Sequence, residues 1–166
     1  QWSRCVVFAV LGLLMWGGTI SLLALQYGWQ GTLTQMGWFF TKAALMTFGG
    51  AYAVLPYVYQ GGLGHYAWLD AVQMIDALAL GETAPGPLIM IVAFVGFVGG
   101  WTKAVFGPEF LFLAGMAGAM AATWFTFLPS FLFILAGGPL VESTHNELRL
   151  TAPLVAITAA VVGVIV

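Results

Sequence analysis

The sequence predicts an all-α, polytopic helical membrane protein in which two helices are interrupted by glycine or proline. Of its 166 residues, 61% are hydrophobic and 6% are charged, whereas about a quarter of the residues of a soluble domain are charged. Two apolar runs are long enough to cross a bilayer, and two other apolar segments contain glycine or proline breaks. So few charged side chains exclude a water-soluble enzyme, a nucleic-acid-binding protein and a disordered tail.

The first predicted span is Cys5–Leu25, an unbroken apolar run of about the twenty residues that a spanning helix needs. Gly28–Gly31 follows as an interfacial turn with Trp29 as an aromatic anchor. A second apolar segment, from about Trp38 to Tyr59, is interrupted at Thr47–Gly50. We therefore expect two short helices there in place of one span.

A glycine-rich stretch and a short helix follow the second segment. Gly61, Gly62 and Gly64 predict a flexible loop, and Trp68 predicts another interface. Leu69–Gly81 then reads as a short helix.

Thr83–Pro87 cannot continue that helix because proline has no amide donor, but Pro87 suits the first turn of a new helix over Leu88–Gly100. Each arm has about 13 residues and a length of roughly 20 Å, which is less than the 30 Å core. The two arms form either one broken span or a re-entrant hairpin.

Two further segments complete the chain. Trp101–Glu109 predicts a polar turn, and Phe110–Gly137 predicts a longer span. Gly138–Leu150 predicts a solvent loop, and Thr151 begins a last helix. Small residues recur every fourth position, which predicts close approach of two helix backbones. They are Gly96 and Gly100 in one segment, and Ala114, Gly118 and Ala122 in the other.

Three ionisable residues, Lys42, Asp76 and Glu82, fall within or beside the interrupted segments. An ionised side chain at the bilayer centre costs roughly 2.5 to 3.5 kcal/mol on insertion scales, so such residues usually face a cavity or a partner. We expect Asp76 and Glu82 to act as gating or proton-linked groups. Two alternatives stay open: Lys42 can snorkel along its stem, and Glu82 can be a helix-end residue near the headgroups.

Two backbone breaks at membrane depth imply a cavity, because non-helical backbone there must be covered by protein or water. Helices that start after Gly50 and at Pro87 would direct free amides and a partial positive charge at this cavity, which favours an anion. Paired breaks of this kind point to a transporter site, although either break alone can be a simple kink. The residues predicted to bind the anion are Lys42, Thr47, Gly49, Gly50, Glu82, Thr83, Pro85, Gly86 and Pro87.

Other chemistries lack the residues that they need. There is no HExxH, GxSxG or Walker-type glycine loop, so we do not expect a metalloprotease, a serine hydrolase or a nucleotide-driven pump. The single cysteine, Cys5, matches no metal-ligand spacing. We expect no enzyme activity, no cofactor, no metal and no nucleic-acid partner.

Three sequence blocks, in this order, resemble the chromate ion transporter family. They are FTKAALMTFGGAYAVLP (Phe40–Pro56), ALGETAPGPLIMIVAFVGFVGGW (Ala79–Trp101) and FLPSFLFIL (Phe127–Leu135). The chain is most similar to the C-terminal half of the long members, which contain two homologous halves. N-terminal halves typically read FGGP and AQxLPGP, whereas this chain has Ala51 after the glycines and Glu82 in place of the glutamine.

The resemblance implies export of chromate across the bacterial inner membrane, with sulfate as a look-alike tetrahedral dianion. It also implies that residues 1–166 form a single domain whose partners are lipid and the homologous other half or a second subunit. The chain starts at Gln1 without methionine and stops within an apolar run, so we expect a fragment. Two alternative interpretations are a non-transporting helical subunit and an uptake permease for sulfate or molybdate.

Overall fold

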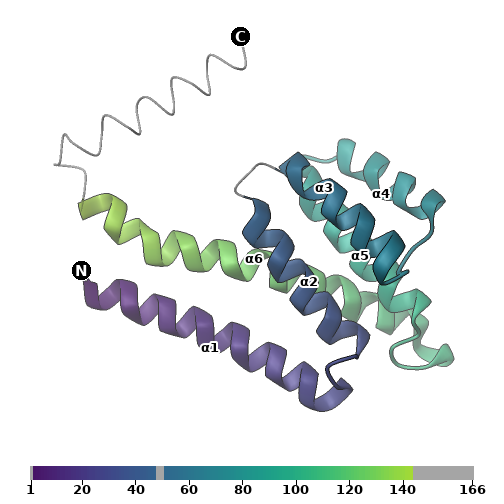
Figure 1. Cartoon of the computed structure of the whole chain (residues 1–166), viewed down its shortest axis with the longest axis horizontal. Helices are drawn as coiled ribbons and strands as arrows, with labels where there is room; N and C mark the ends of the chain where they lie inside the picture. The colour runs from purple at the N-terminus through teal and green to yellow at the C-terminus, as the bar shows by residue number, and fades with distance from the viewer. Residues whose placement is uncertain (1, 48–50, 144–166) are drawn as a thin grey trace, which may run out of the picture. The chain divides into compact units, whose positions relative to one another are not determined.

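The computed structural model describes residues 2–47 and 51–143, and every regular element in these ranges is helical. The prediction of an all-α fold is therefore confirmed. In chain order, the elements are α1 (Trp2–Tyr27), α2 (Thr32–Met46), α3 (Ala51–Tyr59), the π-helix η2 (Gln60–His65), α4 (Ala71–Glu82), α5 (Pro87–Thr102), the short 3-10 helix η3 (Pro108–Phe110) and α6 (Leu111–Ser143) (Figure 1).

The chain divides into two compact units, and the long helices α1 and α6 contribute to both. One unit is Leu13–Ser130, which contains both interrupted segments. The other combines Gln1–Gly12 with Phe131–Val166. Within this second unit α1 and α6 approach closely, since a Cβ added at Gly12 would lie 2.6 Å from Leu132 Cδ1.

Helices α1 and α6 have the length and composition of membrane spans, over Ser3–Tyr27 and Pro108–Gly138. Over residues 3–27 of α1, Ile20 alone is buried, while Leu25 is 86% exposed. Exposed apolar side chains on a long helix are expected where lipid replaces water, because lipid tails are as apolar as leucine.

Helices α2 and α3 form the first of two helical hairpins. Phe39 of α2 stacks on Tyr57 of α3, with ring centroids 4.5 Å apart and an angle of 12° between the rings. The prediction of two short helices is confirmed, although α2 begins at Thr32, well before the expected Trp38. Residues 48–50, which contain the expected break, lie outside the described residues.

The prediction of a flexible loop at Gly61, Gly62 and Gly64 is wrong, because these residues belong to η2. Gly61 and Gly62 are buried, so their backbone groups need partners. The Tyr66 amide donates to the Gly61 carbonyl at 2.9 Å, and the Trp68 amide donates to the Gly62 carbonyl at 2.8 Å. Glycine also permits close packing here, since a Cβ at Gly61 would overlap the ring of Phe39.

The prediction that Trp68 is an interfacial anchor is also wrong, because its side chain is 1% exposed. The chain turns at Ala67, which has a φ of 49°, and Trp68 enters the core. There its ring stacks on Tyr66, with centroids 4.5 Å apart, and meets Phe39 edge to face at 5.3 Å. The burial of a large aromatic surface outweighs an interfacial position.

Helices α4 and α5 form the second hairpin. Asp70 caps α4 in a reciprocal capping box. The Asp70 carboxylate accepts a hydrogen bond from the backbone amide of Gln73 at 2.8 Å, and the side-chain oxygen of Gln73 accepts one from the backbone amide of Asp70 at 2.9 Å. Pro87 is the first residue of α5, as expected, and follows Gly86, whose φ is 98°. Helices α4 and α5 pack against each other, so the arms fold back as a hairpin.

Small residues bring α5 and α6 into close contact, as their spacing predicts. A Cβ added at Gly96 would lie 2.5 Å from the Gly118 carbonyl oxygen and 2.6 Å from the Ala122 Cβ, and a Cβ at Gly100 would overlap the Ala114 carbonyl oxygen. We call these five residues the α5–α6 seam.

The expected solvent loop from Gly138 is wrong for residues 138–143, which continue α6. Helical backbone pairs its own polar groups, so an apolar segment with glycines can remain helical. Residues 144–150 and the helix predicted from Thr151 lie outside the described residues.

Candidate functional site

The N-termini of α3 and α5 lie at the same end of the Leu13–Ser130 unit. The two helices run in the same direction (Figure 1), and they contact each other. Gly62, just beyond the end of α3, lies beside Val95 in the second half of α5, since a Cβ added at Gly62 would lie 3.6 Å from Val95 Cγ1. The ends of α2 and α4 and the starts of α3 and α5 therefore lie at this end, which we call the tip end, and the partial positive charges of both helix starts add there.

The start of α5 has no side-chain cap. Its N-cap residue, Gly86, is exposed, and a Cβ added there would meet only Ile89 Cγ2, at 3.8 Å. The missing Cβ leaves the backbone around this turn open to a ligand. Uncapped amides at a helix start can bind an anion. The expected sites at Gly49 and Gly50 lie outside the described residues.

The two candidate threonines both end helices at the tip end. Thr47 is the C-cap of α2, and its hydroxyl donates to the Ala43 carbonyl at 2.9 Å. Thr83 is the C-cap of α4, and its hydroxyl donates to the Leu80 carbonyl at 2.8 Å. Either hydroxyl would have to rotate away from its own helix before it could donate to an anion.

Lys42 is exposed, and its ammonium nitrogen lies 5.7 Å from the centroid of the Trp38 ring, one turn earlier in α2. Long helical side chains lean toward the N-terminus of their helix. The ammonium group is therefore directed away from Thr47 and the tip end, and it makes a cation–π contact with the indole.

The candidate carboxylates are Asp76, within α4, and Glu82, its last residue. Both are exposed. In the part of the chain that the structure describes, neither carboxylate makes an ion pair with Lys42. The α4–α5 turn brings Glu82, Thr83, Pro85 and Gly86 together, whereas Lys42 lies on a separate hairpin.

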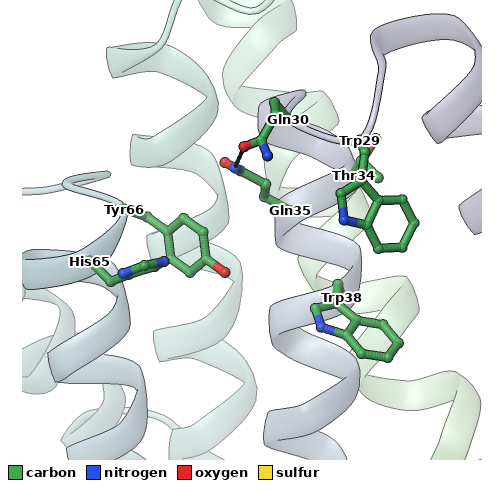
Figure 2. Close-up of a pocket in the computed structure, with 7 residues that line it drawn as sticks. All are labelled: Trp29, Gln30, Thr34, Gln35, Trp38, His65 and Tyr66. Atoms are coloured by element: carbon green, nitrogen blue, oxygen red, sulfur yellow. Dashed lines mark hydrogen bonds between the residues drawn. The ribbon is translucent and has the colours of Figure 1, made fainter.

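A cavity of about 190 Å³ lies at the start of α2, at the opposite end of that helix from Thr47. Figure 2 shows Gln30 and Gln35 between a pair of tryptophans and the His65–Tyr66 pair. The lining residues are Trp29, Gln30, Thr34, Gln35, Trp38, His65 and Tyr66. We call this space the α2 cavity.

The sequence-based site prediction did not include the α2 cavity. One signal for it was available: Gly31 cannot cap a helix through a side chain, and Thr34 and Gln35 follow it at the start of an apolar segment. The signal is weak because His65 and Tyr66 come from η2 and the residue after it, and only the folded chain brings them to the start of α2.

Comparison with known proteins agrees with these motifs. A family described as chromate transporter matches residues 34–166, a range that begins in the first turn of α2 and includes the rest of both hairpins. A chromate transport protein of Cupriavidus metallidurans is 33% identical over 133 residues, which are 80% of this chain and 30% of that protein. A chromate transport protein of Pseudomonas aeruginosa is 39% identical over 124 residues, which are 75% of this chain and 26% of that protein.

The chain thus spans less than a third of the length of these two relatives. No solved structure matches it. The family is one of membrane transporters and not of enzymes, in agreement with the sequence-based prediction. On the family match and these identities, the chain belongs to the chromate transporter family.

Proposed function

We propose that this chain forms one half of a transporter that exports chromate across the bacterial inner membrane, with sulfate as a competing anion. The observation that carries this proposal is the family match over both hairpins, residues 34–166. The named relatives are chromate transport proteins. The direction of transport and the membrane are our inference.

The anion is held at the tip end, between the breaks at Gly49–Gly50 and Pro85–Gly86–Pro87. Two features of the described residues support this position. The starts of α3 and α5 lie at the same end of the unit, so their partial charges reinforce each other. The α5 start also lacks a side-chain cap, which leaves amide donors for the oxygens of a tetrahedral dianion.

Helix lengths also favour a site within the bilayer. Helices α4 and α5 have 12 and 16 residues, or about 18 and 24 Å at 1.5 Å per residue. Neither reaches across a 30 Å hydrocarbon core. We infer that both hairpins are re-entrant, with their tips inside the membrane, where irregular backbone must line a cavity or be covered by protein.

The other half of the transporter, or a second subunit, completes the site. Lys42, Asp76, Glu82 and Thr83 are all exposed in this chain. Ionised side chains that face lipid are costly, so a homologous surface is the expected cover for these polar side chains. In this arrangement, Asp76 and Glu82 act as gating or proton-linked groups.

The membrane potential favours export of a dianion. Moving one charge through 100 mV is worth about 2.3 kcal/mol, so a dianion leaving a negative-inside cell gains about 4.6 kcal/mol per 100 mV. This corresponds to more than three decades in concentration ratio, at about 1.4 kcal/mol per decade. Export therefore needs no coupling ion, whereas uptake does.

The test is chromate flux through liposomes that contain the complete protein, with an imposed potential or an imposed pH gradient. We expect saturable flux toward the positive side, driven by potential alone and inhibited by sulfate. Inward movement that requires a proton or sodium gradient would identify an uptake permease instead. The absence of saturable flux under every gradient would identify a non-transporting subunit.

A further inference from the structure

We propose that the α2 cavity is a second oxyanion site, which binds one tetrahedral oxyanion group through uncharged hydrogen-bond donors. The group is either a free dianion such as sulfate or the phosphate of a lipid headgroup. The site lies at the opposite end of α2 from the proposed transport site. It does not depend on the proposed function, since it can bind an anion whether or not the protein exports one.

The first observation is the hydroxyl of Thr34, which has no hydrogen-bond partner in the structure although Thr34 is 1% exposed. Buried hydroxyls in proteins are nearly always hydrogen-bonded, because an unpaired one loses its interaction with water. The other two buried threonines, Thr41 and Thr126, each donate to a carbonyl four residues earlier, at 2.6 Å. Thr34, by contrast, lines the α2 cavity.

The second observation is the start of α2 itself. This helix has 15 residues, and its N-cap, Gly31, provides no side-chain cap. Thr34 is the third residue of the helix and belongs to the first turn, whose amides have no partners within the helix. A helix start without a cap attracts negative charge.

The remaining lining residues supply donors and no negative charge. The Gln35 amide nitrogen donates to the Gln30 side-chain oxygen at 3.1 Å, which leaves the Gln30 amide hydrogens free for a ligand. Trp29 and Trp38 carry indole N–H donors, and the centroids of their rings lie 6.3 Å apart. None of the seven lining residues is a carboxylate.

A positive charge beside the cavity wall also favours an anion. Trp38 forms part of the cavity wall, and the Lys42 ammonium lies 5.7 Å from its ring. The uncharged donors give the site its geometry, and the lysine adds a long-range attraction that salt will screen.

The experiment uses the complete protein, purified and delipidated in detergent, with sulfate as the probe. Binding at the α2 cavity is read from the emission of Trp29, taken as the difference between the parent and a Trp29→Phe variant. We expect saturable sulfate binding in the parent. Thr34→Val should weaken it about tenfold, because one hydrogen bond to a charged group is lost.

Three variants make this result specific. Thr34→Ser keeps the hydroxyl and should keep the parent's affinity. Thr126→Val removes a buried hydroxyl from α6 and should leave sulfate binding unchanged. Gly86→Ala alters the proposed transport site and should also leave the Trp29 response intact. Because the Thr34 hydroxyl has no protein partner, Thr34→Val should fold with unchanged or higher thermal stability.

Two arms distinguish the sources of the oxyanion group. If the ligand is a lipid, a short-chain phosphatidylglycerol should displace sulfate at lower concentration than sulfate itself binds. If the ligand is a free anion, sulfate binding should be insensitive to that lipid. The proposal is overturned if the parent shows no Trp29 response to sulfate, or if Thr34→Val responds as the parent does.

Discussion

The ammonium group of Lys42 lies 5.7 Å from the ring centroid of Trp38, on the same exposed stripe of α2 and directed toward the start of that helix. The contact links a positive charge to the wall of the α2 cavity and not to the hairpin tips. Lys42 can therefore act on the anion through its field, without touching it at the proposed transport site.

Replacement of Lys42 by glutamine should raise the KM for chromate about two- to fivefold in low salt, because an exposed charge contributes little more than this. The difference should shrink as salt is added. Lys42→Arg keeps both the charge and the stacking on Trp38 and should stay near the parent. Chromate flux into proteoliposomes at two ionic strengths measures the effect, and equal KM values for the parent and Lys42→Gln in low salt would contradict it.

Gly86 should be essential for transport because of where it lies, and not only because of its backbone conformation. Gly86→Ala should reduce chromate flux at least tenfold, since a Cβ at the start of α5 blocks approach to the backbone. The control is Gly107→Ala, in the turn after α5. Both glycines have positive φ, 98° and 92°, so both variants should lose about 1 to 3 kcal/mol of stability.

Thermal unfolding of the two glycine variants, measured with their flux, separates the two causes. Comparable losses of stability with flux lost only in Gly86→Ala would support the site. Comparable losses of both stability and flux would assign the Gly86 effect to strain alone.

Glu82→Gln should lower the KM for chromate about two- to fivefold and also lower kcat. The proposed gate repels a bound dianion, so removal of its charge should tighten binding and slow release. Glu109→Gln, an exposed acid on η3, is the matched control and should behave as the parent. A Glu82→Gln variant with unchanged kcat and KM would leave Glu82 as an ordinary helix-end residue.

Local signals in the sequence were sufficient for most of the fold. Proline in a helix interior removes a backbone hydrogen bond and clashes with the preceding turn. Pro85–Gly86–Pro87 therefore predicted the boundary between α4 and α5. The four-residue spacing of small residues predicted the α5–α6 seam, because small residues at that spacing allow two helix backbones to approach closely in lipid. Whether the arms fold back was not predictable, because the same break serves a kink or a hairpin, and tertiary packing decides between them.

Tertiary contacts also explain what the sequence did not predict. Three glycines within four residues favour a loop by composition, but the ring of Phe39 packs on Gly61 and keeps the segment helical. Trp68 has the local context of an interfacial anchor, and only the stack with Tyr66 reveals its burial. The α2 cavity combines residues from the start of α2 and the end of η2, which no local window contains.

The α5–α6 seam constrains how the protein can change shape. Its contacts are backbone against backbone, with no flexible side chain between Gly96 and Gly118 to absorb a displacement. Packed surfaces of this kind do not deform gradually, and a slide of one residue would drive a side chain into a carbonyl. In any conformational change of the proposed transporter, we expect α5 and the adjoining part of α6 to move as one rigid body. Any hinge is then expected outside this seam.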